Sequence, residues 1–125
     1  MLKKLTLCCT LSLLVYHSNS QRYIPDIGLK TINGESIRSM ELVNQDGFNI
    51  ISFWATWCIP CINELDAINE VITQWNEKEN IKVLAISTDD SRSKKRVRPL
   101  INGKDWIFDV ISDTNQEFKR AMGVV

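Results

Sequence analysis

The chain has 125 residues, which is enough for one domain with a hydrophobic core and too few for two. Its 15 lysines and arginines balance 15 aspartates and glutamates, so the net charge at pH 7 is zero with the histidine neutral. A neutral chain has no overall field that attracts nucleic acid or anionic lipid, and net charge therefore identifies no partner.

The first 20 residues have the three parts of a secretory signal peptide. Lys3 and Lys4 precede an apolar run over residues 5–16, and small or polar residues follow at 18–20. We predict cleavage after residue 20, which gives a signal peptide over 1–20 and one domain over 21–125. The apolar run is shorter than the roughly 20 residues that span a bilayer, but an uncleaved membrane anchor remains the alternative.

Cleavage would remove the only histidine, His17, and two of the four cysteines. The remaining chain would keep Cys58 and Cys61, which excludes nucleophiles paired with histidine and histidine metal sites. Ile62 stands where the c-type haem motif has histidine, so haem attachment is excluded too. We expect no cofactor and no metal. Export would place the cysteine pair in an oxidising compartment, where disulfides persist.

Residues 24–37 predict a hairpin, because an Asn-Gly pair separates two short strand-like runs. One helical turn is expected over residues 39–42. Residues 48–54 form a continuous apolar run, which is typical of a strand buried on both faces of a parallel or mixed sheet. This strand leads directly into the most informative part of the chain.

Residues 53–64 read FWATWCIPCINE, in which a cysteine pair opens a helix. Two intervening residues let both sulfurs meet across one helical turn, so a Cys58–Cys61 disulfide can form and reopen. Pro60 falls in the first turn, where proline is tolerated. The helix N-terminus stabilises the Cys58 thiolate and lowers its pKa, so we predict that Cys58 attacks and the more buried Cys61 resolves. The alternatives are half of a zinc site, which would need four ligands, or a plain structural disulfide.

The helix after the pair has apolar residues spaced for one buried face and is predicted to end near Asn80. Residues 81–87 predict a second buried strand, parallel to the first because a helix connects them. A short strand over 106–111 and a last helix that ends at Gly123 are expected to follow.

A basic segment over residues 92–98 begins a predicted helix between the strands at 81–87 and 106–111. We interpret its charges as a solvated face, because no aromatic residues alternate with them as they do in nucleic-acid sites. We therefore expect no nucleic-acid partner. Docking of an acidic partner surface remains open.

The residues at 53–64 resemble the active site of thioredoxin-like proteins of the TlpA/ResA type, which are exported thiol-disulfide oxidoreductases. The similarity covers most of the chain after residue 25. It implies an α/β thioredoxin-like fold with an N-terminal hairpin, in which Cys58 attacks a partner's disulfide and Cys61 resolves the mixed disulfide. It also implies protein disulfide or dithiol substrates, a membrane thiol-electron donor and a monomer in the bacterial periplasm or cell envelope.

The resemblance assigns roles to further side chains. Glu64 matches an acidic position beside the pair and would assist proton transfer there, although a solvated helix residue is the alternative. Ser52 stands where thioredoxin has a buried aspartate, which leaves Glu64 as the only nearby candidate for that work. Trp57 and Pro60 are expected to line the substrate groove, whereas core packing suits Trp54 better.

Two departures from the family stand out. Asp66 replaces a helix-bending proline of many relatives, so a straighter helix is expected. Residues 123–125 match the segment just before the family's cis-proline, so we expect the domain to lack the C-terminal β-β-α part, and to be poorly soluble and weakly active without it.

The leading function is that of an exported disulfide reductase. A peroxiredoxin-like peroxidase is one alternative, but it requires threonine where this chain has Ala55. A non-catalytic binding domain with a structural disulfide is the other.

Overall fold

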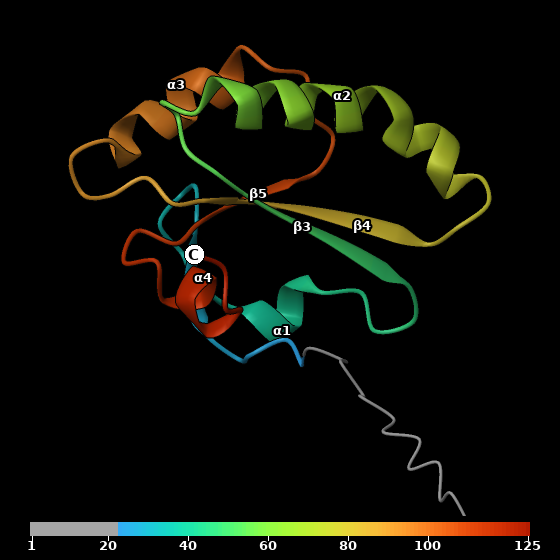
Figure 1. The fold of residues 1–125 in the computed structure, drawn as a ribbon, viewed down its shortest axis with the longest axis horizontal. Helices are drawn as coiled ribbons and strands as arrows, with labels where there is room; N and C mark the ends of the chain where they lie inside the picture. The colour runs from blue at the N-terminus through green and yellow to red at the C-terminus, as the bar shows by residue number, and fades with distance from the viewer. Residues whose placement is uncertain (1–22) are drawn as a thin grey trace, which may run out of the picture.

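The computed structural model describes residues 23–125, so the predicted signal peptide lies outside the described residues. Helices cover both faces of a single sheet (Figure 1). In chain order the elements are β1 (Gly28–Thr31), β2 (Ser36–Arg38), α1 (Ser39–Leu42), β3 (Phe48–Trp54), α2 (Ile59–Asn76), β4 (Ile81–Ser87), the 3-10 turn η1 (Lys94–Arg96), α3 (Val97–Asn102), β5 (Asp109–Ser112) and α4 (Glu117–Ala121). None of the helices within 23–125 is long and apolar enough to cross a membrane.

The five strands lie in the order β2-β1-β5-β4-β3. The predicted hairpin is confirmed, because β1 and β2 pair antiparallel and Gly34 takes a φ of 89° in the turn between them. The predicted parallel pairing of β3 with β4 is also confirmed, and β5 pairs parallel with β4 on its other side. The sheet is therefore mixed. Its parallel part consists of β3, β4 and β5, and the C-terminal end of β3 leads into the loop before the cysteine pair.

Side chains of the central strands alternate between two hydrophobic clusters, as the two-residue period of a strand requires. Leu84 and Ile86 on β4 join the cluster on the face covered by α1 and α4, where Phe118 is also buried. Ala85 points to the opposite cluster, which contains Trp54 and Leu65 beneath α2 and α3. These two clusters hold the helices on the sheet and fix the direction in which α2 leaves β3.

Three predicted boundaries were wrong. Helix α2 ends at Asn76 rather than near Asn80, because the Asn76 Oδ1 accepts the N–H of Ile81 at 2.8 Å and turns the chain into β4. The basic segment enters its helix late, because Asp90 accepts the N–H groups of residues 92 and 93 and holds them in a turn. Strand β5 begins at Asp109, since residue 106 packs elsewhere.

Helix α2 continues without a break through Asp66. The Asp66 carboxylate accepts hydrogen bonds from Lys104 Nζ at 2.5 Å and from Trp106 Nε1 at 2.8 Å. The Lys104 hydrogen bond is the main cause of the lowered pKa of Asp66. Trp106 in turn packs edge-on against Trp54, with ring centroids 5.3 Å apart. Asp66 therefore ties α2 to the segment that leads into β5.

Strand β3 is at the edge of the sheet, because within residues 23–125 it pairs only with β4. Residues 21–125 alone are expected to self-associate through this edge, where unpaired N–H and C=O groups lie beside Phe48, which is 63% exposed. Light scattering at about 100 µM protein should detect oligomers, and Phe48→Lys should reduce them. A monomer at that concentration would contradict this prediction.

Candidate redox site

The cysteine pair lies at the N-terminus of α2, as predicted. Cys58 is the N-cap residue, and Ile59 and Pro60 are the first two helical residues. The C=O of Cys58 accepts the N–H of Ile62 at 3.1 Å, which starts the helical hydrogen bonding. Pro60 has no N–H to leave unsatisfied in this turn, so it favours the helix start. Cys58 therefore sits at the positive end of the helix dipole, where a thiolate is stabilised.

Cys58 and Cys61 are joined by a disulfide, with their Cα atoms 5.3 Å apart. This separation lies within the range that disulfides ordinarily span, so the bond can form on this backbone. Both cysteines are half-buried, but of the two only Cys61 is among the side chains that pack against the core cluster of Trp54 and Leu65. Position on the helix and contact with the core both distinguish the two sulfurs.

The loop before Cys58 is held by the buried carboxylate of Asp89, which is 0% exposed. Asp89 accepts the N–H of Thr56 at 2.9 Å and the hydroxyl of Thr56 at 2.6 Å. It also accepts the Ser87 hydroxyl at 2.9 Å. Two of these hydrogen bonds fix the loop at Thr56, two residues before Cys58, and the third ties the carboxylate to the end of β4.

This role of Asp89 was not predicted from the sequence. The available signal was its place two residues after a buried parallel strand, because the C-terminal ends of parallel strands share one edge of the sheet. Ser52, the residue where thioredoxin has an aspartate, lies within β3 and is half-buried. The buried carboxylate of this site lies two residues after the end of β4 and not within β3.

Two apolar side chains beside the disulfide face solvent. Trp57 is 69% exposed and Ile59 is 63% exposed, whereas Trp54 is 1% exposed and packs in the core. Pro60 is also exposed. The preference for core packing of Trp54 is thus confirmed. Trp57 and Ile59 therefore form an exposed apolar surface next to Cys58.

A hollow of about 460 Å³ adjoins Trp57. Thr88, Arg96 and Gln116 are among the residues that line it. Gln116 has a φ of 55°, and a non-glycine residue in this left-handed region is held there at some cost by its surroundings. The hollow therefore has polar lining groups next to Trp57.

Glu64 is exposed on α2, one turn after Cys61. Within residues 23–125 its carboxylate takes part in no hydrogen bond or ion pair. The structure therefore places it on the helix as predicted, but attaches it to no group of the site.

Comparisons with known proteins agree with this geometry. The model of the AhpC/TSA family matches residues 21–125. The thioredoxin-like protein YneN of Bacillus subtilis is 33% identical over 91 residues, which are 71% of this chain and 51% of YneN. The thiol-disulfide oxidoreductase ResA of Oceanobacillus iheyensis is 33% identical over 97 residues, which are 76% of this chain and 49% of ResA.

A solved thioredoxin-like protein from Porphyromonas gingivalis superposes with a TM-score of 0.68 at 39% identity. The match covers 81% of this chain and 66% of that protein. The predicted thioredoxin-like fold is thus confirmed. The chain spans about half the length of the curated relatives that it matches.

Proposed function

The chain belongs to the AhpC/TSA family, and from that premise we propose that it is an exported thiol-disulfide oxidoreductase that reduces protein disulfides through Cys58 and Cys61. One observation carries the proposal: a disulfide closes the first turn of α2 beside the exposed Trp57. A disulfide serving only stability gains nothing from an exposed tryptophan at its side. The name of ResA, a thiol-disulfide oxidoreductase, gives independent support.

The reaction starts from the reduced pair. The Cys58 thiolate attacks one sulfur of a partner's disulfide, forming a mixed disulfide and releasing the partner's other sulfur as a thiolate that takes up a proton. Cys61 loses its proton and attacks the Cys58 sulfur, which releases the partner's second thiol. Two electrons pass to the partner, and the Cys58–Cys61 disulfide of the present structure is the product state. A second dithiol protein must then reduce the Cys58–Cys61 disulfide again, and we propose that this electron donor is a membrane protein.

The proposal includes the organisation of the chain. Residues 1–20 act as a signal peptide and residues 21–125 carry the redox site of a protein that works as a monomer in the periplasm or cell envelope when the β3 edge is covered. The hollow beside Trp57, together with Pro60, receives the substrate polypeptide. Mass analysis of the protein recovered from an envelope fraction would check the cleavage after residue 20.

The activity test uses the reduced chain and a peptide with one disulfide. Thiol release from the peptide, with one equivalent of Cys58–Cys61 disulfide formed per peptide reduced, is the expected result. Two results together would favour a binding domain with a structural disulfide. They are that no thiol is released from the peptide, and that the Cys58–Cys61 disulfide stays intact at redox potentials that reduce the peptide disulfide.

Peroxide consumption tests the peroxidase alternative. The residue three positions before Cys58 is Ala55, which is 2% exposed and has no hydroxyl. The neighbouring Thr56 hydroxyl is bound to Asp89 and is not free for a peroxide. We therefore expect hydrogen peroxide to oxidise the pair far more slowly than a peptide disulfide does, and the reverse order would favour a peroxidase.

Glu64→Gln is expected to change the pH dependence of disulfide exchange and to leave the fold intact. The reason is the proposed proton transfer between Glu64 and the cysteine pair one helical turn away. Glu70→Gln, at an exposed position of the same helix, is the matched control and should leave the profile unchanged. Rate profiles of the two variants that coincide from pH 5 to 9 would make Glu64 an ordinary surface residue.

A further inference from the structure

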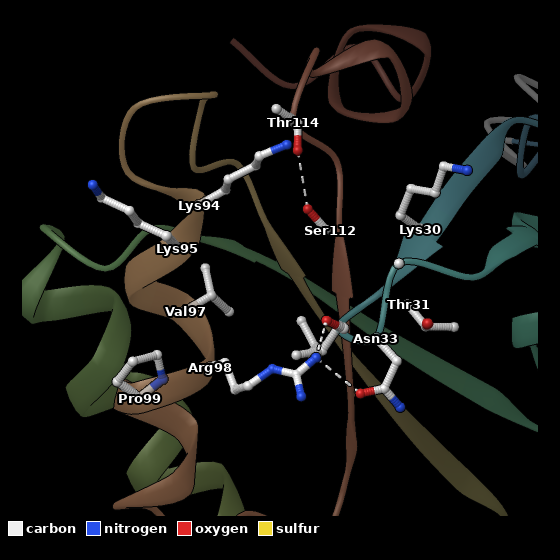
Figure 2. A pocket seen from close by; sticks show the side chains of 12 residues that line it. Lys30, Thr31, Asn33, Lys94, Lys95, Val97, Arg98, Pro99, Ser112 and Thr114 are labelled. Carbon is white, nitrogen blue, oxygen red and sulfur yellow. Dashed lines mark hydrogen bonds between the residues drawn. The ribbon is translucent and has the colours of Figure 1, made fainter.

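A cationic cleft separates α3 from β1 and the turn that follows it. The cleft has a volume of about 630 Å³ and is lined by four cationic residues, Lys30, Lys94, Lys95 and Arg98, and by no aspartate or glutamate. Figure 2 shows Lys94 and Arg98 on the α3 side of the cleft and Lys30 on the β1 side. The Lys30 Nζ is directed away from the α3 side and donates to Ser36 Oγ at 2.7 Å, so Lys30 adds its charge at the rim of the cleft. The chain as a whole has zero net charge, so positive charge is concentrated locally at this cleft. Its size is that of ligand-binding clefts, roughly 300–1,000 Å³.

The charges of the cleft are not neutralised by the described part of the chain. None of its four cationic side chains forms an ion pair within residues 23–125. By contrast, Arg92 of the same basic segment binds Asp90 through Nη2 at 2.7 Å. Asp113 follows the strand at the back of the cleft, but its buried carboxylate accepts two N–H groups of α4. The positive potential of the cleft is therefore available to a ligand.

Arg98 holds the two walls together. Its Nη2 donates to the C=O of Ile32 at 2.8 Å and to Asn33 Oδ1 at 3.0 Å, as Figure 2 shows. The Nε and Nη1 groups of this guanidinium have no partner among the described residues. The hydroxyls of Ser112 and Thr114 are hydrogen-bonded to each other at 3.1 Å at another side of the cleft, which leaves one hydroxyl hydrogen for a ligand. Because the walls are already fixed, a ligand pays little ordering cost on binding.

The cleft and the hollow beside Trp57 share one short segment as a wall. Lys94 and Lys95 of η1 line the cleft, while Ser93 and Arg96 of the same segment line the hollow. A polypeptide that presents its disulfide at Cys58 can therefore pass from the hollow over η1 into the cleft.

We propose that the cationic cleft binds an acidic segment of the protein whose disulfide is exchanged at Cys58. Lysine and arginine side chains on two walls suit several carboxylates spaced along an extended chain. Val97 and Pro99 add apolar contact surface, which a polypeptide uses and a free anion does not. This inference rests on the proposed oxidoreductase function and names the chemistry of its substrate.

Three peptides test the cleft. Each contains one disulfide, followed by a run of glutamates, glutamines or lysines, and the reduced full chain acts on each. We expect kcat/KM for the glutamate peptide to exceed that for the glutamine peptide about five-fold at low ionic strength, with the difference lost at about 0.5 M salt. Lys30→Gln combined with Lys94→Gln should abolish the preference and leave kcat/KM for the glutamine peptide unchanged.

Lys78→Gln combined with Lys119→Gln is the matched control, because it removes the same charge from lysines that do not line the cleft. It should keep the preference. Equal rates for all three peptides, or an equal loss in the control, would overturn the docking proposal while leaving the oxidoreductase function in place. Failure to reduce even the glutamine peptide would overturn that function instead.

A binding measurement on the oxidised protein separates polypeptide from other anions. A fluorescent glutamate peptide without cysteine should bind, and the Lys30→Gln and Lys94→Gln pair should weaken this binding about five-fold. Inorganic phosphate should displace it no better than chloride at equal ionic strength. Selective displacement by phosphate, or by a single-stranded oligonucleotide, would assign the cleft to those ligands and contradict the proposal.

Discussion

Cys58→Ser is expected to abolish disulfide reduction, with a loss on the order of 10³-fold or more, because serine at this position supplies no thiolate. Cys61→Ser should instead retain the first attack and accumulate a mixed disulfide between Cys58 and the substrate, since nothing resolves it. Non-reducing electrophoresis and mass mapping would show which cysteine holds the substrate. The two variants remove the same disulfide, so each controls for the other's effect on stability.

The same assignment predicts the order of alkylation. In the reduced wild type, iodoacetamide near neutral pH should label Cys58 before Cys61, because only Cys58 caps the helix N-terminus. The pKa of the Cys58 thiol should lie below the free-thiol value of about 8.5. The contact of Cys61 with the core cluster of Trp54 and Leu65 favours the same order of labelling. Trapping of the substrate on Cys61, or its faster labelling, would reverse the roles of the two sulfurs.

Asp89→Ala is expected to lower the free energy of unfolding by about 3 kcal/mol, because it leaves the Thr56 N–H, the Thr56 hydroxyl and the Ser87 hydroxyl without their buried acceptor. Urea unfolding would measure the loss. Asp105→Ala, which removes an exposed carboxylate, is the control and should change the stability by no more than about 0.5 kcal/mol.

Asp89 also positions the redox loop, which gives its variant a second and more local effect. Hydrogen exchange at the Thr56 amide should increase in Asp89→Ala by more than the global loss of stability explains, because this N–H loses its acceptor. Thr56→Val keeps the amide and removes only the hydroxyl, so a smaller effect is expected. A protected Thr56 amide in Asp89→Ala would show that the loop is held by other contacts.

The sequence by itself determined the features that depend on neighbouring residues. An Asn-Gly pair placed the hairpin turn, where Gly34 indeed takes a positive φ. The apolar runs of β3 and β4 and the helix between them predicted a parallel pair. The spacing of Cys58 and Cys61 around Pro60 predicted the start of α2 and the disulfide. Backbone propensity and short-range geometry act within a few residues, so such features can be predicted without a fold.

Only the tertiary structure decided the features that join distant parts of the chain. Asp89 was one polar residue among several until its burial against Thr56, 33 residues away, made it the support of the redox loop. The basic segment was interpreted as solvated, and its charges form a cleft only because Arg98 reaches Ile32, 66 residues earlier in the chain. The burial of a group and the electrostatic potential at it depend on all the groups that lie near it in space. Hydrophobic periodicity and residue spacing describe only neighbours along the chain, so they cannot predict either quantity.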